Sequence, residues 1–295
     1  MRSAWVLAFV LGCSSEAASP AAPRVTRAPG CDACHAKQTA EWRASLHHAA
    51  FEDEDFRASL AVEQDRAFCV SCHAPTDPAD GVGCLDCHRV PASHAARGSG
   101  HVATVACAGC HDFTFPRSRE KMQKTAEEHA ASPFSDVPCA SCHMPDKSHA
   151  IALGSRDLDA IARALDVRAT RTSPTSVVVT LRALGVGHDL PTGDLFRRLR
   201  VWVWAEGARG EVLADEERML GRTFVDEHGA RKQADDLRVP ASGLRTVEID
   251  LGDKARGRRV EVRVYYERVA EARGPFESVF ASDVVARASV EGGEP

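Results

Sequence analysis

Apolar residues are arranged differently in the two parts of this 295-residue chain. Up to about residue 155 the apolar runs are short, and a helical period is clearest over 37–48 and 119–131. Further along, apolar residues occupy every second position, as in 259–266, which is the pattern of a half-buried strand. The pattern therefore predicts a helical part followed by a strand-rich part.

The strand-rich part is divided by turn residues, such as the glycines within 207–210 and 241–243. Several short strands at this spacing favour an antiparallel sandwich. A short helix over 156–165 is expected to link this part to the first. The predicted strands cover 176–181, 199–205, 245–251, 259–266 and 279–288.

Five copies of Cys-x-x-Cys-His lie in the first part, where the composition would supply about 0.02 by chance. In this motif two thiols form thioethers with haem c and the histidine ligates the iron. Zinc sites, redox dithiols and disulfide frameworks also use paired cysteines, but none needs a histidine after every pair. The motif residues are Cys31, Cys34 and His35; Cys69, Cys72 and His73; Cys84, Cys87 and His88; Cys107, Cys110 and His111; and Cys139, Cys142 and His143.

We therefore expect five covalently bound haem c groups. So many porphyrins in so short a segment would supply most of its core, which explains why leucine, isoleucine and aromatic residues are scarce there. Only residues 74–83 separate His73 from Cys84, so these two haems are expected to be neighbours. The predicted fold class is α+β, with a haem-packed, mostly α and irregular cytochrome domain, a linking helix and an antiparallel β-sandwich domain. These parts cover 31–155, 156–165 and 166–290, and 291–295 are expected to be disordered.

Three short motifs resemble those of a family of bacterial multihaem cytochromes c, typified by the tetrahaem carrier that accepts electrons from hydroxylamine oxidoreductase. They are Trp42-Arg43-Ala44-Ser45-Leu46-His47; Met144-Pro145 after the fifth haem motif; and Gly187-His188-Asp189-Leu190-Pro191-Thr192-Gly193 with Arg197-Arg198-Leu199 behind it. The resemblance covers roughly 31–205. It implies that His47 and His188 are distal ligands of haem iron, on the far side from the motif histidine.

The other histidines outside the motifs compete for the remaining irons. A surface histidine at 47 and a turn-stabilising histidine at 188 are the alternatives to ligation, and His48 could replace His47 within the same turn. His149 suits a neighbouring haem better than its own. The distal candidates are His47, His101, His149 and His188, with His94 and His129 in reserve; His228 is expected to be solvated, and Met122, Met144 and Met219 are further candidates that would raise the potential.

The N-terminus carries Arg2, an apolar run over 4–11 and then Val10-Leu11-Gly12-Cys13, which resembles a bacterial lipobox. We expect 1–13 to be a lipoprotein-type signal peptide, Cys13 to be lipidated and 14–30 to be a flexible tether. An ordinary signal peptide cut nearby is the alternative. The predicted location is the periplasm or the cell surface, on a membrane anchor.

Two function classes follow. The histidines outside the motifs can fill the second axial position of every iron, which favours an electron carrier. Its expected partners are redox proteins of the cell envelope, and it could act alone or in an oligomer or larger cytochrome complex. The alternative is a multihaem oxidoreductase with one open catalytic haem acting on a small nitrogen or oxygen compound. The net charge of −5, with roughly −10 more from haem propionates, favours basic docking patches and disfavours nucleic acid.

Overall fold

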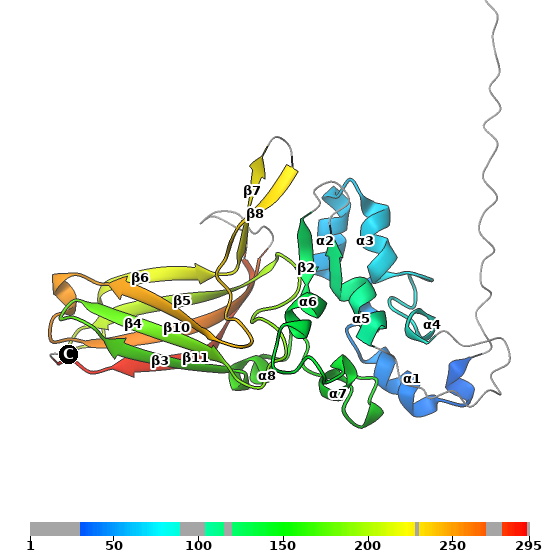
Figure 1. Ribbon diagram of the computed structural model, residues 1–295, viewed down its shortest axis with the longest axis horizontal. Coiled ribbons are helices and arrows are strands. Elements are labelled where there is room, and N and C mark those ends of the chain that lie inside the picture. The colour runs from blue at the N-terminus through cyan, green and yellow to red at the C-terminus, as the bar shows by residue number, and fades with distance from the viewer. Residues whose placement is uncertain (1–29, 89–103, 115–119, 228–229, 270–278, 294–295) are drawn as a thin grey trace, which may run out of the picture.

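The computed structural model describes residues 30–88, 104–114, 120–227, 230–269 and 279–293 (Figure 1). Several sequence predictions fall outside these residues and stay predictions. They are the signal peptide, Cys13 and most of the tether, together with His94, His101 and His228.

Short helices predominate among the described residues of 30–163, which we call the helical segment (Figure 1). Both cysteines of four of the motifs lie within one helix, and the first motif starts with the first residue of η1. The local fold therefore brings the two thiols and the following histidine of each motif close together. No helix among the described residues is long and apolar enough to cross a bilayer. The helices are η1 (Cys31–Ala33), α1 (Ala36–Arg43), η2 (His48–Ala50), α2 (Glu54–Val62), α3 (Arg66–His73), α4 (Cys84–Cys87), α5 (Thr104–His111), α6 (Thr125–Ala130), α7 (Cys139–His143), η3 (Pro145–Lys147) and α8 (Leu158–Arg163).

The described residues of 165–290, which we call the strand segment, form two larger antiparallel sheets and a hairpin. One sheet has the order β11-β10-β5-β6, the other β3-β4-β9, and β7 pairs with β8. A small sheet of β1 (Asp112–Thr114) and β2 (Lys121–Lys124) lies in the helical segment. The described residues are mixed helix and strand with antiparallel sheets, as the α+β class requires, and the predicted arrangement of domains stays a prediction. The other strands are β3 (Leu165–Arg171), β4 (Ser176–Ala183), β5 (Arg197–Glu206), β6 (Val212–Leu220), β7 (Arg222–Glu227), β8 (Ala230–Asp236), β9 (Leu244–Asp250), β10 (Arg259–Val269) and β11 (Val279–Val290), with η4 (Asp253–Ala255) before β10.

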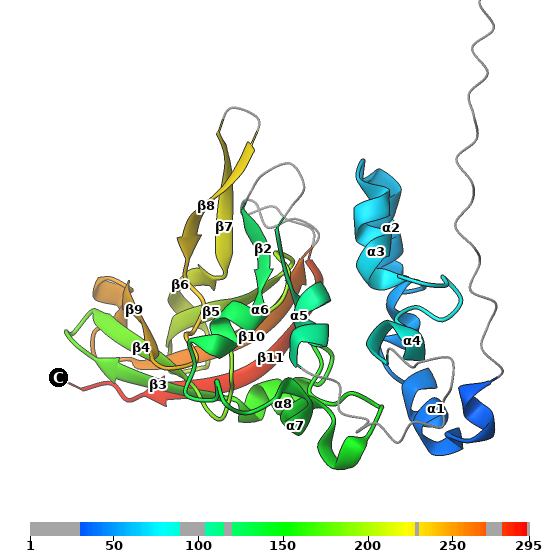
Figure 2. The same cartoon turned by 45° about the vertical axis from the view of Figure 1, so that its right-hand side comes forward.

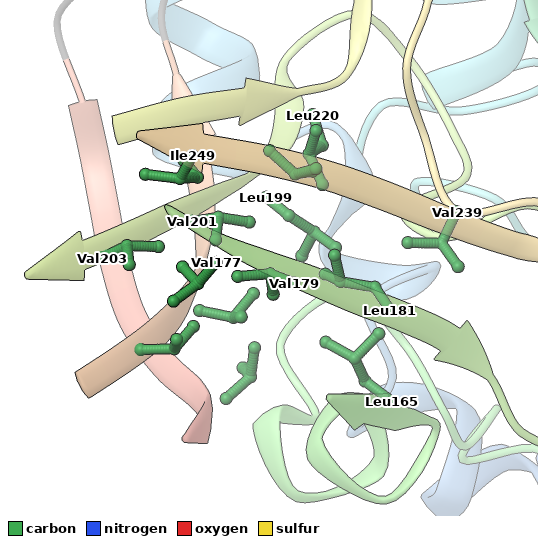
Figure 3. Close-up of a cluster of buried hydrophobic side chains, with 14 of the residues drawn as sticks. Leu165, Val177, Val179, Leu181, Leu199, Val201, Val203, Leu220, Val239 and Ile249 are labelled. Carbon is green, nitrogen blue, oxygen red and sulfur yellow. The ribbon is translucent and has the colours of Figure 1, made fainter. Parts of the chain in front are cut away.

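The core of the strand segment lies between its two larger sheets. Val177 and Val179 of β4 and Val201 and Val203 of β5 are fully buried and converge on one cluster (Figure 3). Each such side chain contributes about 1.5–3 kcal/mol by leaving water. The period-two pattern seen in the sequence is therefore the inward face of these strands. Figures 1 and 2 show the helical segment at one end of this sheet structure, with α8 at the junction.

The helix predicted over 119–131 is wrong in its first half, because residues 121–124 form strand β2 and only 125–130 are helical. Met122 is 2% exposed and packs with Leu195 and Phe224 of the strand segment. The neighbouring Gln123 is buried too and contacts His111. Contacts with distant residues thus outweigh the helical period here.

The helix predicted over 37–48 ends earlier, at Arg43. The hydroxyl of Ser45 donates to the carbonyl of Trp42 at 2.7 Å, and the amide of His48 donates to the same hydroxyl at 3.4 Å. These side-chain bonds compete with helix continuation. They turn the chain so that His47 and His48 leave the axis of α1.

Candidate haem-binding sites

Three histidines from outside the motifs lie beside motif histidines. Two imidazoles that share one metal at a metal–nitrogen distance of about 2.0 Å have ring centroids about 6 Å apart. The observed separations are close to this value, so these residues fit a metal held between each pair. The centroid separations are 6.1 Å for His47 and His111, 5.9 Å for His88 and His149, and 6.3 Å for His143 and His188.

The second ring nitrogen of three of these six histidines, and of the motif histidine His73, contacts a backbone carbonyl. Such a contact fixes Nδ1 as the protonated nitrogen and leaves Nε2 to bind a metal. The rings are therefore oriented as ligands. The Nδ1 contacts are His73 with Ala50 at 3.0 Å, His143 with Ala152 at 3.0 Å, His149 with Lys147 at 3.0 Å and His188 with Asp189 at 3.1 Å.

Burial lowers the pKa of several of these imidazoles. Removal from water disfavours the imidazolium, and for His111 this effect, with the nearby His47 and His143, lowers the pKa to about 4. A neutral imidazole at pH 7 is the form that binds a metal. Burial is also the largest cause of the lowered pKa of His47, His73, His88 and His188.

The loop between the second and third motifs holds His47 in place. Trp42 Nε1 donates to the carbonyl of Val82 at 2.8 Å, and the amide of Val82 donates to the carbonyl of His47 at 2.9 Å. Gly81, with φ +58°, passes so close that a Cβ would lie 2.5 Å from the carbonyl oxygen of His47. The spacing of Trp42 and His47 therefore has a structural reason, because the tryptophan holds the loop that supports the histidine.

His48 occupies a different place from His47. Its ring centroid is 4.3 Å from that of Trp42, and its Nδ1 lies 3.4 Å from the carbonyl oxygen of Asp80. The structure thus pairs His47, and not His48, with a motif histidine, and His48 packs the loop.

His188 reaches the fifth motif from the strand segment. Its loop is tied to the strands because Leu190 and Val239 exchange backbone hydrogen bonds of 2.8 and 2.9 Å. The carboxylate of Asp189 accepts from the amide of Ala241 at 3.1 Å. Two segments far apart in sequence therefore meet at the His143 ring.

Buried ion pairs fix this junction. The guanidinium of Arg238 lies 2.7 Å from Glu128 of α6, 2.8 Å from Asp236 and 3.4 Å from Asp189. The side chains of Arg238 and Glu128 are only 3% and 4% exposed. Charges buried this deeply are retained only when paired, so the two segments are held in one relative position.

His129 is placed near His188. The ring lies against Gly187, where a Cβ would be 3.2 Å from His129 Cδ2. Within the described residues it has no ring contact with a motif histidine like those of the three pairs. His73 stacks on Phe56 with centroids 3.8 Å apart. The second ligands at His35 and His73 stay predictions.

The methionines take structural positions. Met122 is a buried core residue beside Leu195, Phe224 and Phe113, which argues against its predicted ligand role. Met144 caps the end of α7, and Met219 on β6 is 37% exposed.

Thiols from different motifs lie next to one another. Cys72 is within hydrogen-bonding reach of Cys110, Cys31 of Cys84, and Cys107 of Cys139. Cys87 lies near both cysteines of the fourth motif. The five attachment sites therefore form one connected set. The expected neighbourhood of the haems at His73 and His88 stays a prediction, because none of these contacts between described cysteines joins the second motif directly to the third.

No protein-family model and no curated protein matches this chain. Among solved structures it is similar to a penta-heme cytochrome c552 from Thermochromatium tepidum, with a TM-score of 0.68 and 19% identity. The alignment covers 88% of this chain and 97% of that one. This chain shares that cytochrome's fold. The likeness to the tetrahaem carrier of hydroxylamine oxidation stays a prediction.

Proposed function

We propose that this protein is a pentahaem c-type cytochrome that carries electrons between redox partners of the cell envelope. The main support for this proposal is the set of three histidine pairs, whose ring centroids lie 5.9–6.3 Å apart. Imidazole on both sides of an iron leaves no axial position for a substrate, which suits conduction better than catalysis.

The chain's own residues would hold and tune the haems. The ten motif cysteines would form the thioethers, and the five motif histidines would ligate the irons. Haem supplies one-electron chemistry when bound, while the protein holds the groups close and excludes water. The thiol contacts support this role, since Cys107 and Cys110 of the fourth motif lie near cysteines of the second, third and fifth motifs.

The proposed architecture is a haem-packed domain followed by a β-sandwich domain. The shared fold of the penta-heme cytochrome supports it, because an alignment over 88% of this chain must include both the helical and the strand segment.

Haem content and spin state test the proposal. Intact mass and a pyridine haemochrome assay should give five haems per chain. The ferric protein should be low-spin and should not bind cyanide while folded. A high-spin signal, or cyanide binding without unfolding, would instead favour an oxidoreductase with one open haem.

Export and anchoring are a separate part of the proposal, supported by the sequence of residues 1–13. We expect Cys13→Ser to move the exported protein from the membrane fraction to the soluble fraction, because the thiol that takes the lipid is lost. An unchanged membrane fraction would contradict lipidation at this residue. Alkaline washes, applied alike to membranes with the unmodified protein and with the variant, distinguish a lipid anchor from adsorption to a charged surface.

A further inference from the structure

The histidine of the fourth motif differs from those of the second and fifth motifs in what contacts its Nδ1. At His73 and His143 the contact is a backbone carbonyl. At His111 it is the side-chain amide of Gln123, 2.9 Å away. A backbone carbonyl is the same whatever residue carries it, whereas a side chain can be selected for its chemistry.

Gln123 begins a chain of polar contacts that crosses from the helical to the strand segment. Its amide lies 3.3 Å from Thr125 Oγ1, which lies 2.8 Å from Thr192 Oγ1. The Thr192 hydroxyl donates to Glu128 at 2.7 Å, and the other oxygen of Glu128 lies 2.7 Å from Arg238. Gln123 is 9% exposed and Glu128 7% exposed, so the two side chains at either end of the hydroxyl pair are shielded from water.

The role of the amide follows from the chemistry of a ligating imidazole. With Nε2 on a metal, Nδ1 of His111 carries a proton and donates it. The carboxamide of Gln123 must then present its oxygen to Nδ1, which a half-turn about its last bond allows. An acceptor at Nδ1–H makes the imidazole a stronger base and favours the ferric state of the iron that it binds.

The two threonines affect how well that oxygen accepts. The three contacts run from Gln123 to Thr125, from Thr125 to Thr192 and from Thr192 to Glu128. The two threonine hydroxyls have only two protons to donate among them. Glu128, as the ion-pair partner of Arg238, accepts the proton of Thr192, so the proton of Thr125 points to Thr192. The amide oxygen is then left to His111. Without the Thr192 hydroxyl, Thr125 would turn its proton to the amide and compete with His111.

We infer that Gln123 is a positioning residue that sets the reduction potential of the haem at Cys107 and Cys110, and that Thr192 of the strand segment adjusts it. This inference rests on the proposed function, because it takes His111 as an iron ligand.

The test is a spectroelectrochemical titration of the holoprotein with variants at both ends of the chain. Gln123→Leu removes the acceptor, so at a fixed applied potential the reduced-to-oxidised ratio of one haem should rise about tenfold, which is about 59 mV for one electron. Gln123→Glu supplies a stronger acceptor and should shift the same haem in the opposite direction. Thr192→Val should shift it in the direction of the leucine variant, by less.

Thr180→Val is the matched control, since Thr180 lies on β4, outside the polar chain, and its loss of a hydroxyl should leave all five potentials unchanged. The affected haem is identified by its electron paramagnetic resonance (EPR) signal, because the ring planes of His47 and His111 meet at 79°, which gives an unusually large g value.

Shifts of the same sign from Leu and Glu at position 123, or none, would overturn the inference. If the Leu or Glu variant at position 123 loses a haem, the reduction potentials of Thr192→Val and Thr180→Val are compared instead. Equal potentials in these two variants would overturn the inference. Failure of the proposed function is distinguishable, because it appears in the unmodified protein as a missing haem or a high-spin signal.

Discussion

Buried positions in the strand segment hold apolar side chains such as Val177, Leu199 and Val262, which pack against one another between two sheets. Among the described residues of the helical segment, buried positions hold polar side chains, including Thr39, Ser45 and Gln123, at least as often as apolar ones. A segment of this kind cannot gain enough from its own apolar burial to offset the entropy of ordering the chain. We therefore expect the strand segment to fold by itself and the helical segment to depend on the proposed haem groups for its core.

The two segments should differ most in how much secondary structure they keep when haem is absent. When the chain is produced without haem attachment, we expect the helical segment to lose its helices while the strand segment keeps its sheets. Hydrogen exchange should show rapid exchange of amides over α1–α7 and continued protection of Val179, Val201 and Val264, which lie in the core. Native protection of the helices in the haem-free protein would show that the helical segment folds without haem.

Gly81→Ala should displace His47. A Cβ there would lie 2.4 Å from the carbonyl oxygen of His48, and φ is +58°, a conformation that costs alanine about 1–2 kcal/mol by itself. We expect one haem to become high-spin. Gly257→Ala in the strand segment is the matched control, with φ +62° and nothing within 4 Å of a Cβ. Its similar backbone strain should leave the haem spectrum unchanged, and equal spectra for both variants would contradict the role given to Gly81.

His188→Ala should turn the haem of the fifth motif high-spin, because the strand segment then no longer supplies an imidazole opposite His143. Magnetic circular dichroism of the ferric protein measures the change. His129→Ala is the control, since that ring lies nearby and, within the described residues, has no ring contact with a motif histidine like that of His188. A low-spin spectrum in the His188 variant would remove this residue from the ligand set.

The ion pairs between the segments should differ in their effect on stability. Glu128→Gln leaves the buried Arg238 short of one partner and should lower the free energy of unfolding by about 3 kcal/mol. Asp55→Asn breaks the partly exposed pair of Asp55 with Arg268 and should cost less than about 1 kcal/mol. Chemical denaturation of the holoprotein measures both values, and equal losses would show that burial does not decide the strength of these contacts.

The sequence predicted the strand segment better than the arrangement of the helical segment. All five predicted strands are present, because a buried sheet face imposes alternation on the residues themselves. Strand β6 was not predicted, since it is an edge strand whose charged residues, such as Glu216 and Arg218, face solvent. Strand β2 was misassigned because its buried residues are held by tertiary contacts that leave no local period.

Ligand pairing is the part that no local pattern could supply. The motif histidines follow directly from the attachment signature, and His47 and His188 came from a family resemblance. The approach of His149 to His88 joins residues separated by a stretch that includes two further motifs, so it depends on the tertiary fold alone. The Gln123 contact with His111 was missed because a lone glutamine carries no sequence signal.

Low-temperature EPR of the ferric holoprotein reports the ligands of each iron, and therefore tests whether every haem has two axial ligands, as an electron carrier requires. Ring planes at 79° in the His47 and His111 pair should give a low-spin signal with a large g value, since neither iron dπ orbital is then favoured. Planes at 23° and 18° in the other two pairs should give rhombic low-spin signals. Low-spin signals that together account for all five haems would support the carrier. A high-spin signal that integrates to one haem or more per chain would contradict it.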